Sequence, residues 1–285
     1  MRRASLFSLV VGVVLVIIKA VAWSFTDSLS MLSSLADSML DVIASTINFV
    51  AVRYALQPPD HEHRFGHGKA EDLATLAQST FICGSGVFLI IEGAKRLFAP
   101  EAVHNDLIGI GVMVVSVVLS LLLVAYQRHV VRKTLSGIIA ADAMHYFVDF
   151  LTNVGVIAAL ILSVKFGLKV ADPIVALCIA FYIIYGAFFI GSKAFQNLMD
   201  HEFSDSERAD IEHIVRSDKE VLGLHDLRTR KSGILGFIQF HLDLDGNISL
   251  GHAHEISDRV EDALAAAFPN TEILIHQDPR GGDRK

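Results

Sequence analysis

Residues 29–55 read LSMLSSLADSMLDVIASTINFVAVRYA, and the organisation of the chain can be worked out from this segment. Its length suits a membrane-spanning helix, because a bilayer core of about 30 Å requires roughly 20 helical residues. It nevertheless carries Asp37 and Asp41, whose spacing of four residues places both carboxylates on one helix face, with Ser45 and Asn48 continuing the stripe. Two carboxylates in a membrane helix are costly, from about 2.5 kcal/mol each, and repel one another. A cation or a proton between them is therefore expected.

The composition places the rest of the chain in a membrane as well. Hydrophobic residues make up 52% of the 285 residues and charged residues 19%, too few polar groups to cover an ordinary soluble domain. A net charge of -7 gives no indication of nucleic-acid binding, whereas the 13 histidines point to metals or protons. Both cysteines, Cys83 and Cys178, lie in apolar runs, so that any metal site is expected to use nitrogen and oxygen ligands.

Six apolar segments are long enough to cross a bilayer, and the first is interpreted as a span because no cleavage pattern of small residues follows it. They cover about 6–25, 29–55, 72–98, 106–127, 138–163 and 170–192. Basic residues gather before the first span and after the second and fourth, at Arg2, Arg3, Arg53, Arg64, Lys69, Arg128, Arg132 and Lys133. Positive charges favour the cytoplasmic side, which predicts cytoplasmic termini. Residues 1–195 are thus expected to form an all-α transmembrane bundle of six helices.

After the sixth span the composition becomes polar, and residues 196–285 are expected to form a cytoplasmic domain with the order α-β-β-α-β. Ser204 and Ser249 are suitable residues to begin its two helices. The strands are expected at 222–230, 234–245 and 271–277. In the middle strand one face is expected to carry Ile238, Phe240, Leu242 and Leu244, and the other Phe237, Gln239, His241 and Asp243. Helices on one face of a small sheet make a ferredoxin-like or related α+β module.

The fifth span repeats the pattern of polar groups four residues apart. It carries His145 and Asp149, flanked on the same stripe by Asp142 and Asn153. Together with Asp37 and Asp41, they offer three carboxylates and one imidazole. This set suits a tetrahedral Zn²⁺ site and also accepts Fe²⁺, Cd²⁺ or Co²⁺, whereas Ca²⁺ and Mg²⁺ favour more oxygen ligands.

A salt bridge or a water-filled cleft could also account for acids inside the spans. No Lys or Arg lies in the middle of any span except Lys19, which is toward the outer part of the first span. A salt bridge within the protein is therefore a poor explanation. Each polar stripe alone could instead face a water-filled cleft. A cleft explains less well why two stripes in separate spans have matched spacing.

Two further groups of polar residues could bind metal. Asp60, His63 and His67 lie within eight residues of one loop and could wrap an ion, although a loop rich in His and Gly is also an ordinary solvated turn. In the C-terminal part, His241 and His276 could converge at a sheet edge or on a partner subunit. From the residues alone, solvated surface histidines are the simpler interpretation, and they are also expected at His201, His213 and His252.

The motifs together resemble the cation diffusion facilitators over essentially the whole chain. They are Asp37-xxx-Asp41, His145-xxx-Asp149, the loop His61-Glu-His-Arg-Phe-Gly-His67-Gly-Lys69 and the segment His225-Asp-Leu-Arg-Thr-Arg230. The resemblance implies export of a divalent metal from the cytoplasm in exchange for protons, by a homodimer in the bacterial inner membrane. Zn²⁺ is the expected substrate and Fe²⁺ or Cd²⁺ are alternatives; no enzymatic activity is implied.

The resemblance also implies a role for particular residues. The transport site would comprise Asp37, Asp41, His145 and Asp149, with Met144 at the position of a hydrophobic gate. A second site in the loop would comprise Asp60, His63 and His67. A binuclear zinc site in the dimerising C-terminal domain would comprise His225, His241, His254, His276, Gln277 and the bridging Asp278. A charge interlock near the membrane surface would involve Lys69, Asp200 and Arg230, for which a plain solvated ion pair is the alternative.

Other classes of function make different predictions. A passive metal channel would use the same ligands without proton coupling. A metal sensor would bind metal at the C-terminal histidines and use the spans only as an anchor. An enzyme is disfavoured because no nucleophile, nucleotide loop or phosphate motif accompanies the membrane ligands.

Overall fold

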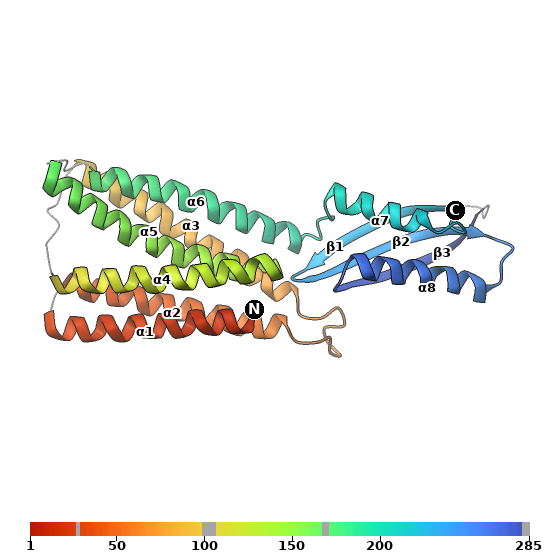
Figure 1. The fold of residues 1–285 in the computed structure, drawn as a ribbon, viewed down its shortest axis with the longest axis horizontal. Coiled ribbons are helices and arrows are strands. Elements are labelled where there is room, and N and C mark those ends of the chain that lie inside the picture. The colour runs from red at the N-terminus through yellow and green to blue at the C-terminus, as the bar shows by residue number, and fades with distance from the viewer. Residues whose placement is uncertain (27–28, 99–106, 167–170, 281–285) are drawn as a thin grey trace. The chain divides into compact units, whose positions relative to one another are not determined.

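The computed structural model describes residues 1–26, 29–98, 107–166 and 171–280. It divides into two compact units, Met1–Phe195 and Gln196–Lys285. Figure 1 shows long helices in the first unit and a small sheet with two helices in the second.

The first unit contains the six expected long helices. They are α1 (Arg2–Thr26), α2 (Leu29–Ala55), α3 (Lys69–Phe98), α4 (Leu107–Thr134), α5 (Gly137–Phe166) and α6 (Ala171–Leu198). Among the described residues, five of them have the length and apolar composition of a membrane span, and α5, which carries two acids and a histidine in its first half, is not among these five. The helix α4 continues past its predicted end at residue 127, because its last residues contain no helix breaker and two basic residues there complement the helix dipole.

Polar side chains lie inside this bundle, and large apolar side chains cover its outside. Phe88, Phe188 and Phe189 are each more than two thirds exposed, whereas His145 is 9% exposed. Such a distribution is stable only where the surroundings are as apolar as lipid. Between α3 and α6 the helices approach closely at glycine: a Cβ atom on Gly86 would lie 2.6 Å from Ile184.

The second unit has the predicted element order. It comprises α7 (Asp205–Ser217), β1 (Gly223–Ser232), β2 (Leu235–Asp245), α8 (Leu250–Ala267) and β3 (Thr271–Arg280). The sheet order is β1-β2-β3, with β1 antiparallel and β3 parallel to the central strand β2. The predicted helix starts are confirmed, since Ser204 forms a complete capping box and Ser249 caps α8.

The core of this unit lies between β2 and the two helices. Ile238, Phe240, Leu242 and Leu244 of β2 are at most 2% exposed and pack in one cluster with residues of α7 and α8. The alternation predicted from the sequence is therefore confirmed for this face. Phe237, expected on the polar face, is only 3% exposed because the guanidinium of Arg230 covers its ring at 4.1 Å.

Candidate metal sites

The membrane site forms where α2 and α5 bring their polar stripes together. Asp41, His145 and Asp149 each offer a ligand atom, and these atoms lie within 4.8 Å of one another. His145 Nε2 is 2.9 Å from Asp41 Oδ1, a hydrogen bond that holds the imidazole against the neighbouring helix. A donor set of one imidazole and two carboxylates, largely removed from water, is chemically suited to a divalent transition metal.

Asp37 lies outside this cluster. It is one turn before Asp41 on α2 and is exposed, so its carboxylate is not among the atoms that converge. Lys19 reaches α2 at the same level, where its Nζ donates to Ser38 Oγ at 2.7 Å and to the backbone oxygen of Ser34 at 3.2 Å. A cation therefore lies beside the polar stripe. The sequence singles out Lys19 but does not predict that it reaches the second span, because that contact depends on how α1 and α2 pack.

Met144 lies next to the membrane site in an apolar cluster. It packs with Val148 against Ile82 of α3 and Ile183 of α6. Its methyl group would lie 2.5 Å from a Cβ on Gly186, so the absence of a side chain at Gly186 makes room for Met144. This position, beside His145 and between three helices, is compatible with a gate.

The loop between α2 and α3 gathers its three predicted ligands. Asp60 Oδ1 accepts hydrogen bonds from the backbone N–H groups of Glu62 and His63, at 2.9 and 2.6 Å. Its Oδ2 lies 3.2 Å from His67 Nε2, and the rings of His63 and His67 are 4.6 Å apart. The backbone N–H groups of His63 and Glu62 hold the pKa of Asp60 below its ordinary value, so this carboxylate is ionised at neutral pH.

In the C-terminal unit, three histidines line up across the sheet. The strand register pairs His225 with His241 and His241 with His276. Asp278 lies among them: its Oδ2 is 2.8 Å from His241 Nδ1 and 3.3 Å from His225 Nε2, and its Oδ1 is 3.2 Å from His276 Nε2. The hydrogen bond from His241 is the main cause that lowers the pKa of Asp278 below its ordinary value. One carboxylate in contact with three imidazoles can bridge two ions.

Two residues predicted for this site are placed apart from the cluster. Gln277 faces α8, where its Nε2 donates to Ser257 Oγ at 2.8 Å, because successive residues of a strand point to opposite faces. His254 is on α8 and lies 3.5 Å from Asp258. Asp243, which was not among the predicted ligands, lies 3.2 Å from His225 Nδ1. Its position two residues after His241 on the same strand face is the signal that would have identified it.

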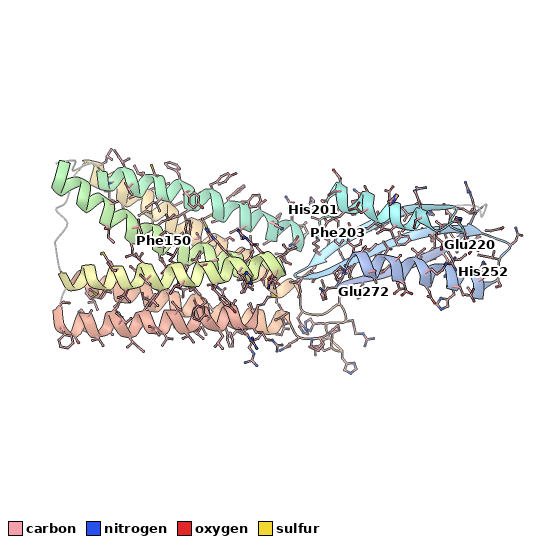
Figure 2. All side chains as sticks on the ribbon, viewed as in Figure 1. Phe150, His201, Phe203, Glu220, His252 and Glu272 are labelled. Carbon is pink, nitrogen blue, oxygen red and sulfur yellow. The ribbon has the colours of Figure 1, made fainter. Side chains whose placement is uncertain are left out.

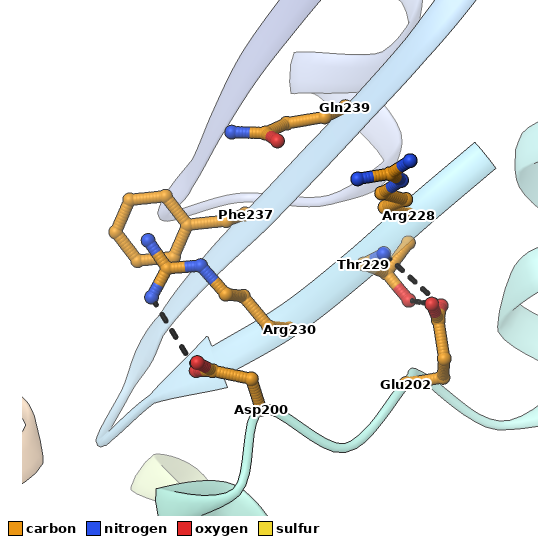
Figure 3. Close-up of a pocket in the computed structure, with 7 residues that line it drawn as sticks. All are labelled: Asp200, Glu202, Arg228, Thr229, Arg230, Phe237 and Gln239. Atoms are coloured by element: carbon orange, nitrogen blue, oxygen red, sulfur yellow. Dashed lines mark hydrogen bonds and ion pairs between the residues drawn. The ribbon is translucent and has the colours of Figure 1, made fainter. Parts of the chain in front are cut away.

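Two of the three residues of the predicted charge interlock, Asp200 and Arg230, lie in the second unit. Asp200 and Arg230 form an ion pair at 3.6 Å. They line a pocket of about 200 Å³ together with Glu202, Arg228, Thr229, Phe237 and Gln239 (Figure 3). Lys69 begins α3 in the other unit.

Of the histidines expected to be solvated, His252 contacts the carboxylates of two glutamates. Its Nε2 lies 2.6 Å from Glu220 Oε2 and its Nδ1 lies 3.3 Å from Glu255 Oε2 (Figure 2 labels His252 and Glu220). These hydrogen bonds, with Glu220 first, raise the pKa of His252. The pair with Glu220 joins the start of α8 to the segment before β1.

Both units match families of known proteins. A family described as "Cation efflux transmembrane domain" matches residues 5–199, and one described as "Cation efflux protein, cytoplasmic domain" matches residues 203–280. The chain is 48% identical over 278 residues to the "Cation-efflux pump FieF" of Shewanella oneidensis, covering 98% of this chain and 94% of that protein. It is 47% identical over 277 residues to the protein of the same name from Cronobacter sakazakii, covering 97% and 92%. A solved structure described as "Putative Zinc Transporter CzrB (Zn form)" is 33% identical over 30% of this chain and 99% of that one, with a TM-score of 0.27.

Proposed function

The chain belongs to the cation efflux family, the cation diffusion facilitators, and on that premise we propose that it exchanges cytoplasmic Zn²⁺ for protons across the bacterial inner membrane. It is a multi-pass metal-efflux transporter and not an enzyme. Fe²⁺ and Cd²⁺ are further candidate substrates, because sites of carboxylates with one imidazole discriminate poorly among such ions. The matched cytoplasmic domain supports cytoplasmic termini.

The observation that carries the proposal is the convergence of Asp41, His145 and Asp149 from two membrane helices. The hydrogen bond of 2.9 Å between His145 and Asp41 needs a proton between the same atoms that would coordinate a metal. A divalent ion can bind only when its ligands have lost their protons, so metal and proton compete for one set of atoms. Loading the ion releases protons, and reprotonation releases the ion; this competition is the chemical basis of exchange.

A fourth ligand is proposed at Asp37. Its place one turn along α2 from Asp41 allows its carboxylate to approach the ion if α2 shifts or the side chain turns inward. A tetrahedral ion would then hold α2 and α5 together through two ligands from each. Met144 is proposed to close one side of the occupied site with its apolar side chain.

The other clusters are proposed as accessory sites. Asp60, His63 and His67 would hold one ion in the loop. The row of His225, His241 and His276 with Asp278 would hold two ions in a C-terminal domain that forms a homodimer, with His254 as a further ligand. Its position on the sheet face opposite to α7 and α8 leaves the row accessible to a second subunit. Lys69 would complete the interlock with Asp200 and Arg230.

Replacing Asp149 by Ala tests the proposal. We expect the purified variant, reconstituted in vesicles, to lose metal-driven proton exchange. The matched control is Asp278→Ala, which removes a carboxylate from the C-terminal cluster and leaves the membrane ligands in place; it should retain exchange. Full activity of Asp149→Ala would refute the site.

Metal flux that persists without any pH change in the wild-type protein would instead indicate a passive channel. Titration with Zn²⁺, Fe²⁺, Cd²⁺ and Mn²⁺ would rank the metals.

A further inference from the structure

Four buried polar side chains, one from each of four helices, form a network that the transport site does not use. Asp142 of α5 accepts hydrogen bonds on both carboxylate oxygens, from Asn48 Nδ2 of α2 at 3.0 Å and from Gln127 Nε2 of α4 at 2.6 Å. Asn48 Nδ2 also donates to Gln78 Oε1 of α3 at 2.8 Å. The four residues are between 0 and 7% exposed. We call Asn48, Gln78, Gln127 and Asp142 the inner latch.

The inner latch lies on one side of the transport site. Asp142 is three residues, about one turn, before His145, toward the start of α5. Asn48 is seven residues, about two turns, after Asp41, toward the end of α2. The start of α5 and the end of α2 are both next to basic loops, and these loops are expected on the cytoplasmic side. A cation moving between the cytoplasm and its ligands must therefore pass the level at which these four side chains meet.

The hydrogen bonding of the inner latch is incomplete. Gln127 Oε1 and Gln78 Nε2 are buried without a hydrogen-bond partner, and both residues are more than nine-tenths buried. A buried amide group without a partner is unfavourable, whereas the same group in contact with water is satisfied. The closed arrangement thus gives up hydrogen bonds that a hydrated, open arrangement would restore. The small difference in hydrogen bonding between the closed and the hydrated arrangement is expected of an element that opens and closes. A permanent structural network is expected to satisfy all its buried groups.

From these observations we infer that the inner latch closes the transport site toward the cytoplasm, and that Asp142 is the positioning residue that holds it shut. The inference rests on the proposed function. In the closed arrangement the Asp142 carboxylate ties α5 to α2 and α4 on the cytoplasmic side of the metal ligands. When α2 and α4 move away from α5, both hydrogen bonds to Asp142 break together and water enters. The network thereby links access from the cytoplasm to the separation of α2 and α4 from α5.

An exchange of side chains tests this inference. Asn48→Asp places two carboxylates about 3 Å apart, as the present hydrogen-bond distance implies. Asp142→Asn removes the anion, and the double variant restores one carboxylate and one amide in exchanged positions. In the double variant, Gln78 can turn its amide so that the unpaired Nε2 donates to the new carboxylate.

The measurements are zinc flux in vesicles and zinc affinity in detergent, both on the full chain. We expect each single variant to lower kcat by about tenfold, equivalent to about 1.4 kcal/mol, while the zinc Kd of the membrane site changes by less than about threefold. The double variant should recover at least about half of the wild-type kcat. Ser116→Ala, which alters another buried polar residue of α4, should leave both quantities unchanged.

Three results would overturn the inference: normal turnover in both single variants, no recovery in a folded double variant, or equal losses in kcat and affinity. If the single variants do not fold, turnover of the double variant alone decides the question. Because zinc flux is followed directly, the result does not depend on proton coupling. Failure of the proposed function would show as wild-type protein without flux or as an active Asp149→Ala variant.

Discussion

At the scale of single residues, the carboxylate of Asp60 has two roles in the loop: it anchors the backbone and it faces a histidine of the proposed metal site. Asp60 Oδ1 holds the loop backbone through Glu62 and His63, and Oδ2 faces His67. The lowered pKa of Asp60 means that this acid stays ionised as the pH falls into the mildly acidic range. A metal ion binds only to deprotonated ligands, so binding at this site should weaken as the pH falls.

Two substitutions separate these roles of Asp60. Asp60→Asn keeps an oxygen for the backbone and replaces the second ligand oxygen by an amide N–H₂, so the loop should keep its shape and lose its metal. Asp60→Ala should lose both. The measurements are zinc stoichiometry and the rate of tryptic cleavage after Arg64. Both variants should bind one ion fewer per chain, and only Asp60→Ala should be cleaved faster. Equal cleavage of both variants would contradict the anchoring role.

At the scale of elements, the bundle depends on close contact between α3 and α6. A Cβ at Gly86 would lie 2.6 Å from Ile184 Cγ1 and 3.4 Å from the backbone oxygen of Ala180, whereas a Cβ at Gly84 would meet nothing within 4 Å. Small residues let membrane helices approach, since packing rather than hydrophobic burial drives their association in lipid. The two glycines lie on one helix, two residues apart, and serve as test and control.

Gly86→Val should push α3 away from α6, and Gly84→Val should be tolerated. We expect Gly86→Val to lower the melting temperature in detergent and to reduce transport, with a loss of stability of about 1–3 kcal/mol, the usual range for overpacking. Thermal unfolding of the two purified variants measures the difference. Equal melting temperatures would contradict the view that the bundle depends on close contact between α3 and α6 at Gly86.

At the scale of the whole molecule, each unit has its own core. The C-terminal core contains residues of α7, β2 and α8, and the buried clusters of the membrane unit contain residues of α1 to α6. The ligands of the membrane site all lie in the first unit. Transport and C-terminal metal binding are therefore expected to be separable.

Removing residues 200–285 should leave a membrane protein that retains residual transport and loses the zinc ions bound by the C-terminal histidines. Flux in vesicles and zinc stoichiometry check this expectation. A metal sensor would lose all function on the same deletion, because the histidines that bind the metal would be gone. The variant His241→Ala provides a control, since it alters C-terminal metal binding while keeping the domain.

The sequence by itself determined the order of elements in both units, the two helix caps and the spacing of four residues in the second and fifth spans. These features follow from local periodicity and from which residues suit helix ends. It could not decide which polar groups meet across helices: the exclusion of Asp37 from the converged ligands, the reach of Lys19 to Ser38, and the contacts of Asp142 with Asn48 and Gln127. Such contacts depend on the distance and rotation between helices far apart in the chain, which packing alone sets.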